Sequence, residues 1–106
     1  MEAITSYAEF SDVISSNEAV LLYVSSPGCS VCHALLPQVE TLLEDFPSVT
    51  SVYANTGIAP DIAGQLTVFS VPAILFFIQG KEVFRVARFV PIGGLRERIT
   101  SSLKMI

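Results

Sequence analysis

The chain has 106 residues, the size of one domain, and we expect a single domain over residues 1–106. Hydrophobic residues make up 51 % and charged residues 15 % of the sequence, which excludes intrinsic disorder because disordered chains have low hydrophobicity and high net charge. The net charge is −4, and all six Lys and Arg residues follow residue 80. Because phosphate neutralisation needs a larger basic surplus, we expect no nucleic-acid partner.

Hydrophobic periodicity and turn residues divide the chain into helices and strands. Ser6 and Glu9 have the spacing of a capping box, which starts the first helix. Residues 19–25 form an apolar run without alternation, typical of a strand buried on both faces in a parallel sheet. Pro37 falls inside the long second helix and should kink it, because proline lacks an N–H and crowds the preceding turn. In chain order, the predicted elements are a helix at 6–17, a strand at 19–25, a helix at 29–46, a strand at 49–54, a short helix at 60–66, strands at 73–78 and 82–88 joined by a hairpin turn, and a helix at 92–106.

This order of elements predicts an α/β sheet layered by helices. The most apolar stretch, 68–78, is interrupted by Ser70 and Pro72 and is shorter than the ~20 residues of a membrane span. Residues 1–6 contain neither the basic segment nor the apolar core of a signal peptide. We therefore expect a cytoplasmic protein without a membrane partner.

The only two cysteines, Cys29 and Cys32, stand where a predicted strand turns into a helix. A separation of three residues at a helix start places both sulfurs on one face, within reach of a disulfide. A disulfide between them would close so short a loop that it would stabilise the folded protein only slightly. The pair is therefore better explained as a reversible dithiol than as a structural disulfide. The helix N-terminus supplies partial positive charge and free N–H groups at Cys29, which favours the thiolate.

Three features of the sequence resemble the thioredoxin family over nearly the whole chain. They are the Cys29–Cys32 pair at a strand-to-helix turn, Pro37 five residues after Cys32, and Val71-Pro72 before an apolar strand and a hairpin. The resemblance implies a thioredoxin-like three-layer α/β/α sandwich with a central mixed sheet. It also implies that the Val71–Pro72 bond is cis, that its loop faces the Cys29 sulfur, and that the Val71 backbone pairs with the extended chain of a substrate.

In function, the resemblance implies a thiol–disulfide oxidoreductase that reduces protein or low-molecular-weight disulfides. Cys29 would attack the substrate disulfide as nucleophile, and Cys32 would resolve the mixed disulfide. No bound cofactor is required, and the expected partners are disulfide-containing proteins or small thiols together with an electron-donating reductase or thiol. We expect a monomer. The alternatives are a binding module that holds extended peptides in the Pro72 groove with little turnover, and a redox sensor whose disulfide changes the binding of a partner.

The sequence departs from the family pattern around the cysteines. The family's usual motif is Trp-Cys-Gly-Pro-Cys, and here Gly28 replaces the Trp while Ser30 and Val31 replace Gly-Pro. The family's buried acid on the central strand is Tyr23 in this chain, its lysine on the next strand is absent, and the glycine usual after the last strand is replaced within 88–90. Because the acid aids proton transfer to the resolving sulfur, we expect weaker catalysis of protein disulfide reduction than in a typical thioredoxin.

Tyr23, His33 and Arg88 are candidates for tuning the cysteine pair. Tyr23 either hydrogen-bonds near Cys32 in place of the missing acid or is a core aromatic residue with a satisfied hydroxyl. His33 lies one helical turn after Cys29 and either stabilises its thiolate or is a solvated helix residue. Arg88 either reaches the rim of the active site and engages an anionic substrate, or protects the edge of the sheet by its charge, as Arg85 would.

The Cys-x-x-Cys-His segment at 29–33 also permits two kinds of metal site. Its spacing matches covalent haem attachment in c-type cytochromes, and the two cysteines with His33 could be three zinc ligands. Haem attachment needs export and usually a distant Met ligand, for which Met105 is the only residue besides Met1. Structural zinc needs a fourth ligand, and none is apparent. We therefore expect no metal at this segment.

Overall fold

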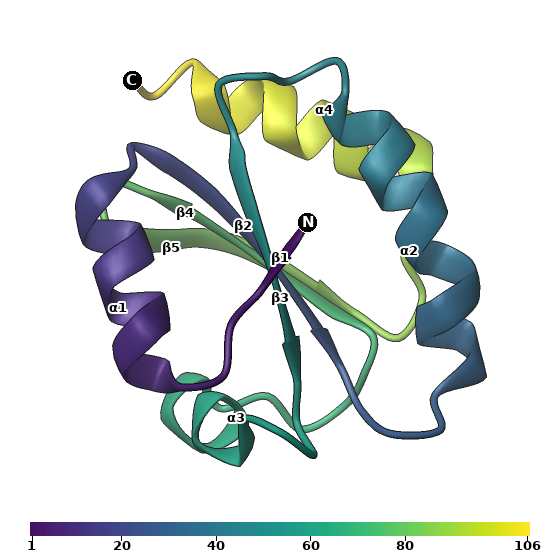
Figure 1. Ribbon diagram of the computed structural model, residues 1–106. Coiled ribbons are helices and arrows are strands. Elements are labelled where there is room, and N and C mark those ends of the chain that lie inside the picture. Colours follow the sequence, from purple (N-terminus) through teal and green to yellow (C-terminus); the bar gives the residue numbers. More distant parts are fainter.

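The computed structural model describes residues 1–106 as a five-stranded mixed sheet with helices on both faces (Figure 1). The strands lie in the order β1-β3-β2-β4-β5. Helices α1 and α3 cover one face of the sheet, and α2 and α4 cover the other. The three-layer α/β/α sandwich expected from the sequence is thereby confirmed. In chain order, the elements are β1 (Glu2–Ala3), α1 (Tyr7–Ser16), β2 (Ala19–Ser25), α2 (Ser30–Leu43), β3 (Thr50–Asn55), α3 (Pro60–Leu66), β4 (Ala73–Ile78), β5 (Lys81–Ala87) and α4 (Ile92–Leu103).

Strand β2 is the centre of the sheet, and all of its residues are buried. It pairs in parallel with β3 and antiparallel with β4, so the sheet around it is mixed. Leu21 and Tyr23 belong to the apolar core under α2 and α4, whereas Val20, Leu22 and Val24 belong to the core under α1 and α3. Burial on both faces explains the unbroken apolar run of this strand.

Helix α1 begins and ends with side-chain hydrogen bonds. The Ser6 hydroxyl accepts a bond from the Glu9 N–H at 3.1 Å, as the capping-box spacing predicts. The return bond lies one residue earlier than in the standard motif, because the Glu9 carboxylate accepts the Thr5 N–H at 3.2 Å. At the other end, the Asn17 side-chain amide donates to the Val13 carbonyl at 2.9 Å and takes over an unpaired helix acceptor.

The two long helices end three residues earlier than the apolar periodicity predicts. α2 ends at Leu43 rather than at residue 46, and α4 ends at Leu103 rather than at residue 106. In both cases the next N–H groups donate to carbonyls three residues back, which is the tighter 3₁₀ pattern common at helix ends. The two-residue strand β1 was not predicted, because a segment so short shows no periodicity.

The β4–β5 hairpin is tighter than predicted. Gln79 and Gly80 both have positive φ values of 50° and 81°, which define a two-residue turn of type I′. Lys81 therefore already pairs with Ile78 as the first residue of β5. The strand ends at Ala87, and Arg88, which was expected to be its last residue, lies just outside it.

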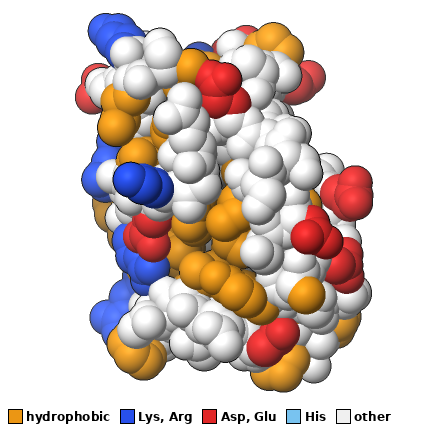
Figure 2. Space-filling view, turned by 90° about the vertical axis from the view of Figure 1, so that its left-hand side faces the viewer, with side chains coloured by type: hydrophobic (Ala, Val, Ile, Leu, Met, Phe, Trp, Pro, Cys, Tyr) orange, Lys and Arg blue, Asp and Glu red, His pale blue; other side chains and the backbone are white.

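Charge is segregated on the molecular surface. In Figure 2, Lys and Arg gather on the side of the edge strand β5, and most Asp and Glu lie on the opposite side. This follows from the sequence, since all Lys and Arg residues lie in β5, α4 and the segments flanking them. None of the helices is long and apolar enough to cross a membrane.

Candidate active site

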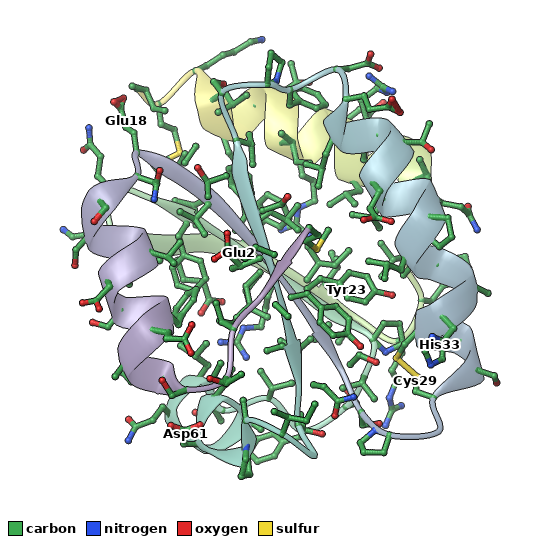
Figure 3. The ribbon with its side chains drawn as sticks, viewed as in Figure 1. Glu2, Glu18, Tyr23, Cys29, His33 and Asp61 are labelled. Carbon is green, nitrogen blue, oxygen red and sulfur yellow. A yellow bond between two sulfur atoms is a disulfide. The ribbon has the colours of Figure 1, made fainter.

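The cysteine pair lies at the N-terminus of α2, directly after the loop that leaves β2 (Figure 3). Cys29 is the N-cap residue, and its Sγ accepts a hydrogen bond from the Cys32 N–H at 3.2 Å. The two residues form a disulfide, with their Cα atoms 5.3 Å apart. The sulfur of Cys29 therefore occupies the position where a helix N-terminus favours negative charge.

The two cysteines differ in accessibility. Cys29 is partly exposed, whereas Cys32 is only 1 % exposed and belongs to the core under α2 and α4. A disulfide or thiol that arrives from solvent therefore meets Cys29 first. This is the division of labour that thiol–disulfide exchange needs, with an accessible attacking sulfur and a shielded second one.

A left-handed residue shapes the loop before the pair. Gly28 has a φ of +74°, and the Cys29 N–H donates to the Ser26 carbonyl at 3.3 Å. Glycine adopts such a φ at no steric cost, whereas other residues are strained there. Gly28 thus has a backbone role at the position where the family usually carries Trp.

The segment Val71-Pro72 lies beside the end of β2 from which the cysteine loop departs. Ala73, the first residue of β4, pairs with Val24 near the end of β2. The Val71–Pro72 peptide bond is cis, Pro72 is buried, and Val71 is half-buried against both apolar cores. The sheet register therefore brings the two predicted parts of the site, which are far apart in sequence, to the same end of neighbouring strands.

Arg88 lies at this same end of the sheet. Ala87 pairs with Ala73, and the Arg88 N–H donates to the Pro72 carbonyl at 2.8 Å. Its φ is +69°, which explains why the family usually carries glycine in this loop. The Arg88 side chain is exposed and forms no ion pair. Arg85, by contrast, is bound to Glu82 by a bond of 2.6 Å.

Tyr23 is a core aromatic residue whose hydroxyl is hydrogen-bonded beside the resolving cysteine. Its ring is fully buried and stacks on the ring of Tyr53, with 6.0 Å between the ring centroids. Its hydroxyl donates to the backbone carbonyl of Cys32 at 2.7 Å, so it contacts the resolving cysteine through the backbone. Burial, and secondarily Tyr53, raises the pKa of Tyr23 to about 12. No carboxylate is buried, because the buried polar side chains are Ser25 and Ser102.

His33 is an exposed residue on α2, at the same end of the helix as Cys29 (Figure 3). Its backbone N–H donates to the Cys29 carbonyl at 3.2 Å. The chain contains no group of three or more His, Cys, Asp and Glu residues arranged to hold a metal ion.

Two exposed aromatic residues that were not predicted from the sequence lie near the site. Phe69, which lies three residues before Pro72, is 93 % exposed. Phe89, which directly follows Arg88, is 81 % exposed. A surface hollow of about 260 Å³ extends from Ser26 to Phe69 and Val71. These two residues could have been predicted from their positions in the sequence, because one lies in the loop before β4 and the other in the loop after β5.

Similarity to known proteins decides the family. The sequence profile of the Thioredoxin family matches residues 2–101. The chain belongs to the thioredoxin family. It is 36 % identical over 99 residues to the thioredoxin-like protein YdfQ of Bacillus subtilis, covering 93 % of this chain and 88 % of that protein. It is 29 % identical over 97 residues to a thioredoxin of Mycoplasmoides gallisepticum, covering 92 % of this chain and 97 % of that protein.

Solved structures agree with the sequence relatives. The thioredoxin of Fasciola hepatica superposes with a TM-score of 0.88 at 25 % identity, covering 95 % of this chain and 98 % of that one. The expected family and fold are confirmed. Together with the Cys29–Cys32 pair, they make this chain a thioredoxin-like thiol–disulfide oxidoreductase.

Proposed function

We propose that the protein works in the reducing direction and donates electrons from the Cys29–Cys32 dithiol to disulfides of proteins or small molecules. The observation that supports exchange through two thiols is the pairing of a partly exposed sulfur at a helix N-terminus with a sulfur that is 1 % exposed. Such an arrangement presents one thiol to a substrate and reserves the other for resolution.

The reaction consists of two exchange steps. The Cys29 thiolate attacks one sulfur of a substrate disulfide, forms a mixed disulfide, and releases the first substrate thiolate, which takes a proton from solvent. Cys32 then loses its proton and attacks the Cys29 sulfur, which breaks the mixed disulfide and releases the second thiol. Two electrons have passed from the dithiol to the substrate, and the protein is left with the Cys29–Cys32 disulfide.

The neighbouring backbone supports the first step. The Cys32 N–H that donates to the Cys29 sulfur would stabilise a thiolate there, and the partial positive charge of the α2 N-terminus acts in the same direction. His33 lies one turn away and would add to this effect when protonated. The Val71 backbone, beside the end of β2, is the segment that we assign to pairing with an extended substrate chain.

The proposal also covers partners and location. The dithiol must be restored by a reductase or by a small thiol, and no bound cofactor takes part in either exchange step. A reducing role suits the cytoplasm, where thiols are kept reduced. We propose that the protein acts as a monomer, because Cys29, Cys32 and the Val71 segment suffice for both exchange steps.

Reduction of insulin disulfides tests the proposed function. The protein is supplied with dithiothreitol, or with a thioredoxin reductase and its reductant, and precipitation of the insulin B chain is followed. We expect acceleration over reductant alone that Cys29→Ser abolishes. A folded protein that forms and loses its disulfide but accelerates no reduction would instead support the redox sensor or the binding module.

A further inference from the structure

Arg88 stands apart from the other basic residues of the chain. Lys81 begins β5 at the opposite end of that strand, and Lys104 follows α4. Arg85 and Arg96 form ion pairs with Glu82 and Asp45, and Arg98 lies over the Phe84 ring, with 4.6 Å between its guanidinium carbon and the ring centroid. Arg88 is therefore the one arginine that has an exposed side chain and neither an ion-pair nor an aromatic partner.

The backbone fixes Arg88 next to the site. Its N–H bond to the Pro72 carbonyl, at 2.8 Å, ties the loop after β5 to the segment that we assign to substrate pairing. The pairing of Ala87 with Ala73, and of Ala73 with Val24, places all three strand ends side by side. A substrate chain that lies along Val71 therefore passes the residue from which the guanidinium extends.

No carboxylate in the flanking segments offsets this charge. Residues 19–39, which include the cysteine pair, contain no Asp or Glu, and neither do residues 62–81, which include Pro72. The N-terminus of α2 adds further partial positive charge. Arg88 and the α2 N-terminus thus place positive charge at the reactive end of a chain whose net charge is −4.

We propose that Arg88 makes the protein select disulfides that carry a carboxylate close to the sulfur atoms. This rests on the proposed function and assigns the substrate class of the same site. The planar guanidinium binds a carboxylate through two parallel hydrogen bonds, and the interaction steers the anion toward Cys29. The exchange itself is unchanged: the Cys29 thiolate displaces one carboxylate-bearing thiolate, Cys32 displaces the second, and two electrons pass to the substrate.

Three small disulfides that differ in charge test this proposal. They are 3,3′-dithiodipropionic acid, which is a dianion at neutral pH, 2-hydroxyethyl disulfide, which is neutral, and cystamine, which is a dication. Pre-reduced protein is mixed with each one in the absence of other reductants, and the second-order rate constant of its oxidation is measured at low and high salt. The informative quantity is the ratio of the dianion rate constant to the neutral one, because a general change in reactivity cancels from it.

Arg88→Gly is the main variant, since glycine accepts the φ of +69° at this position. We expect Arg88→Gly to lower this ratio about three- to fivefold at low salt, which is the size of an exposed charge interaction. The rate constant with cystamine should rise relative to that with the neutral disulfide. The effect should shrink at high salt, and Arg88→Lys should restore only part of the ratio, because lysine supplies the charge but not the two parallel hydrogen bonds. Arg88→Gln provides a second neutral variant, and Lys81→Gln, which removes a charge at the far end of β5, should leave the ratio unchanged.

An unchanged ratio in folded Arg88→Gly and Arg88→Gln, or an equal loss in Lys81→Gln, would overturn the proposal. The proposed function fails in a different way. In that case the pre-reduced wild-type protein would oxidise no faster with the neutral disulfide than a free thiol does.

Discussion

At the scale of single residues, the main chemical difference from a typical thioredoxin is that Tyr23 replaces the buried acid. Its hydroxyl is committed to the Cys32 carbonyl at 2.7 Å, and its pKa of about 12 keeps it neutral near pH 7. A neutral phenol that already donates its hydrogen is a poor acceptor for the Cys32 proton. The step that this replacement should affect is the resolution of the mixed disulfide by Cys32.

We predict that Tyr23→Asp speeds resolution at least about tenfold at neutral pH, because a carboxylate near Cys32 can accept its proton. The variant should also lose roughly 2 kcal/mol or more of unfolding free energy, since a carboxylate is costly to bury. With Ellman's reagent, release of the second thionitrobenzoate reports resolution separately from the first attack. Tyr23→Phe is the matched control, which removes the hydroxyl without adding an acid. A folded Tyr23→Asp variant with the resolution rate of wild type would contradict the kinetic role of this position.

The raised pKa of Tyr23 also predicts how stability depends on pH. Because the pKa is about 12 in the folded protein against 10.0 ordinarily, the neutral phenol supports folding fully below pH 10. This contribution is lost as the pH rises from 10 to 12. Between pH 9 and 11 the wild type should lose about 1 kcal/mol more unfolding free energy than Tyr23→Phe, measured by urea denaturation of the oxidised proteins. Equal losses in the two proteins would show that burial does not perturb this tyrosine.

At the scale of elements, the start of α2 determines which sulfur reacts. Cys29 is partly exposed and accepts the Cys32 N–H, whereas Cys32 is 1 % exposed. In the reduced protein, substoichiometric iodoacetamide at pH 7 should therefore label Cys29 at least about ten times faster than Cys32, as measured by peptide mapping. The same experiment in urea serves as the control and should label both residues similarly. Preferential labelling of Cys32 in the folded protein would reverse the assigned roles.

The edge strand β5 is joined to α3 through one side chain. Arg85 donates to the carbonyls of Leu66 and Thr67 at 2.8 and 2.9 Å, at the end of that helix, and pairs with Glu82. We predict that Arg85→Ala lowers the unfolding free energy by about 1–2 kcal/mol, because charge-assisted bonds to helix-end carbonyls are lost. Lys81→Ala, which removes a charge from the same strand without such bonds, should stay within about 0.5 kcal/mol. Chemical denaturation measures both, and equal effects would mean that Arg85 contributes only its charge.

At the scale of the whole molecule, the sequence predicted the layered architecture because its longer helices and strands have clear apolar patterns. Residues 19–25 and 73–78 are buried throughout, and the apolar residues of the final helix at steps of three and four point into one core. The two cysteines, Pro37 and Val71-Pro72 then fixed the family. Such features are local in sequence, which is why sequence patterns identify them.

The details that depend on tertiary contacts could not be predicted in the same way. The bond from Tyr23 to the Cys32 carbonyl and the bond from Arg88 to the Pro72 carbonyl join residues that meet only through the sheet register and helix packing. The helix ends depend on which carbonyl groups accept hydrogen bonds from the last N–H groups. Strand β1 forms by pairing with the edge of β3. The exposure of Phe69 is likewise invisible in the sequence, where an aromatic residue normally suggests burial.

Mass spectrometry of single-cysteine variants tests the assigned chemistry most directly. Reduced Cys32→Ser and Cys29→Ser proteins are each mixed with 2-hydroxyethyl disulfide at neutral pH, beside the wild type. We predict that Cys32→Ser accumulates a stable mixed disulfide on Cys29, that Cys29→Ser stays unmodified over the same time, and that the wild type becomes lighter by two hydrogen atoms with no adduct. An adduct that accumulates on Cys29→Ser, or a wild type that retains the adduct without closing its own disulfide, would contradict it.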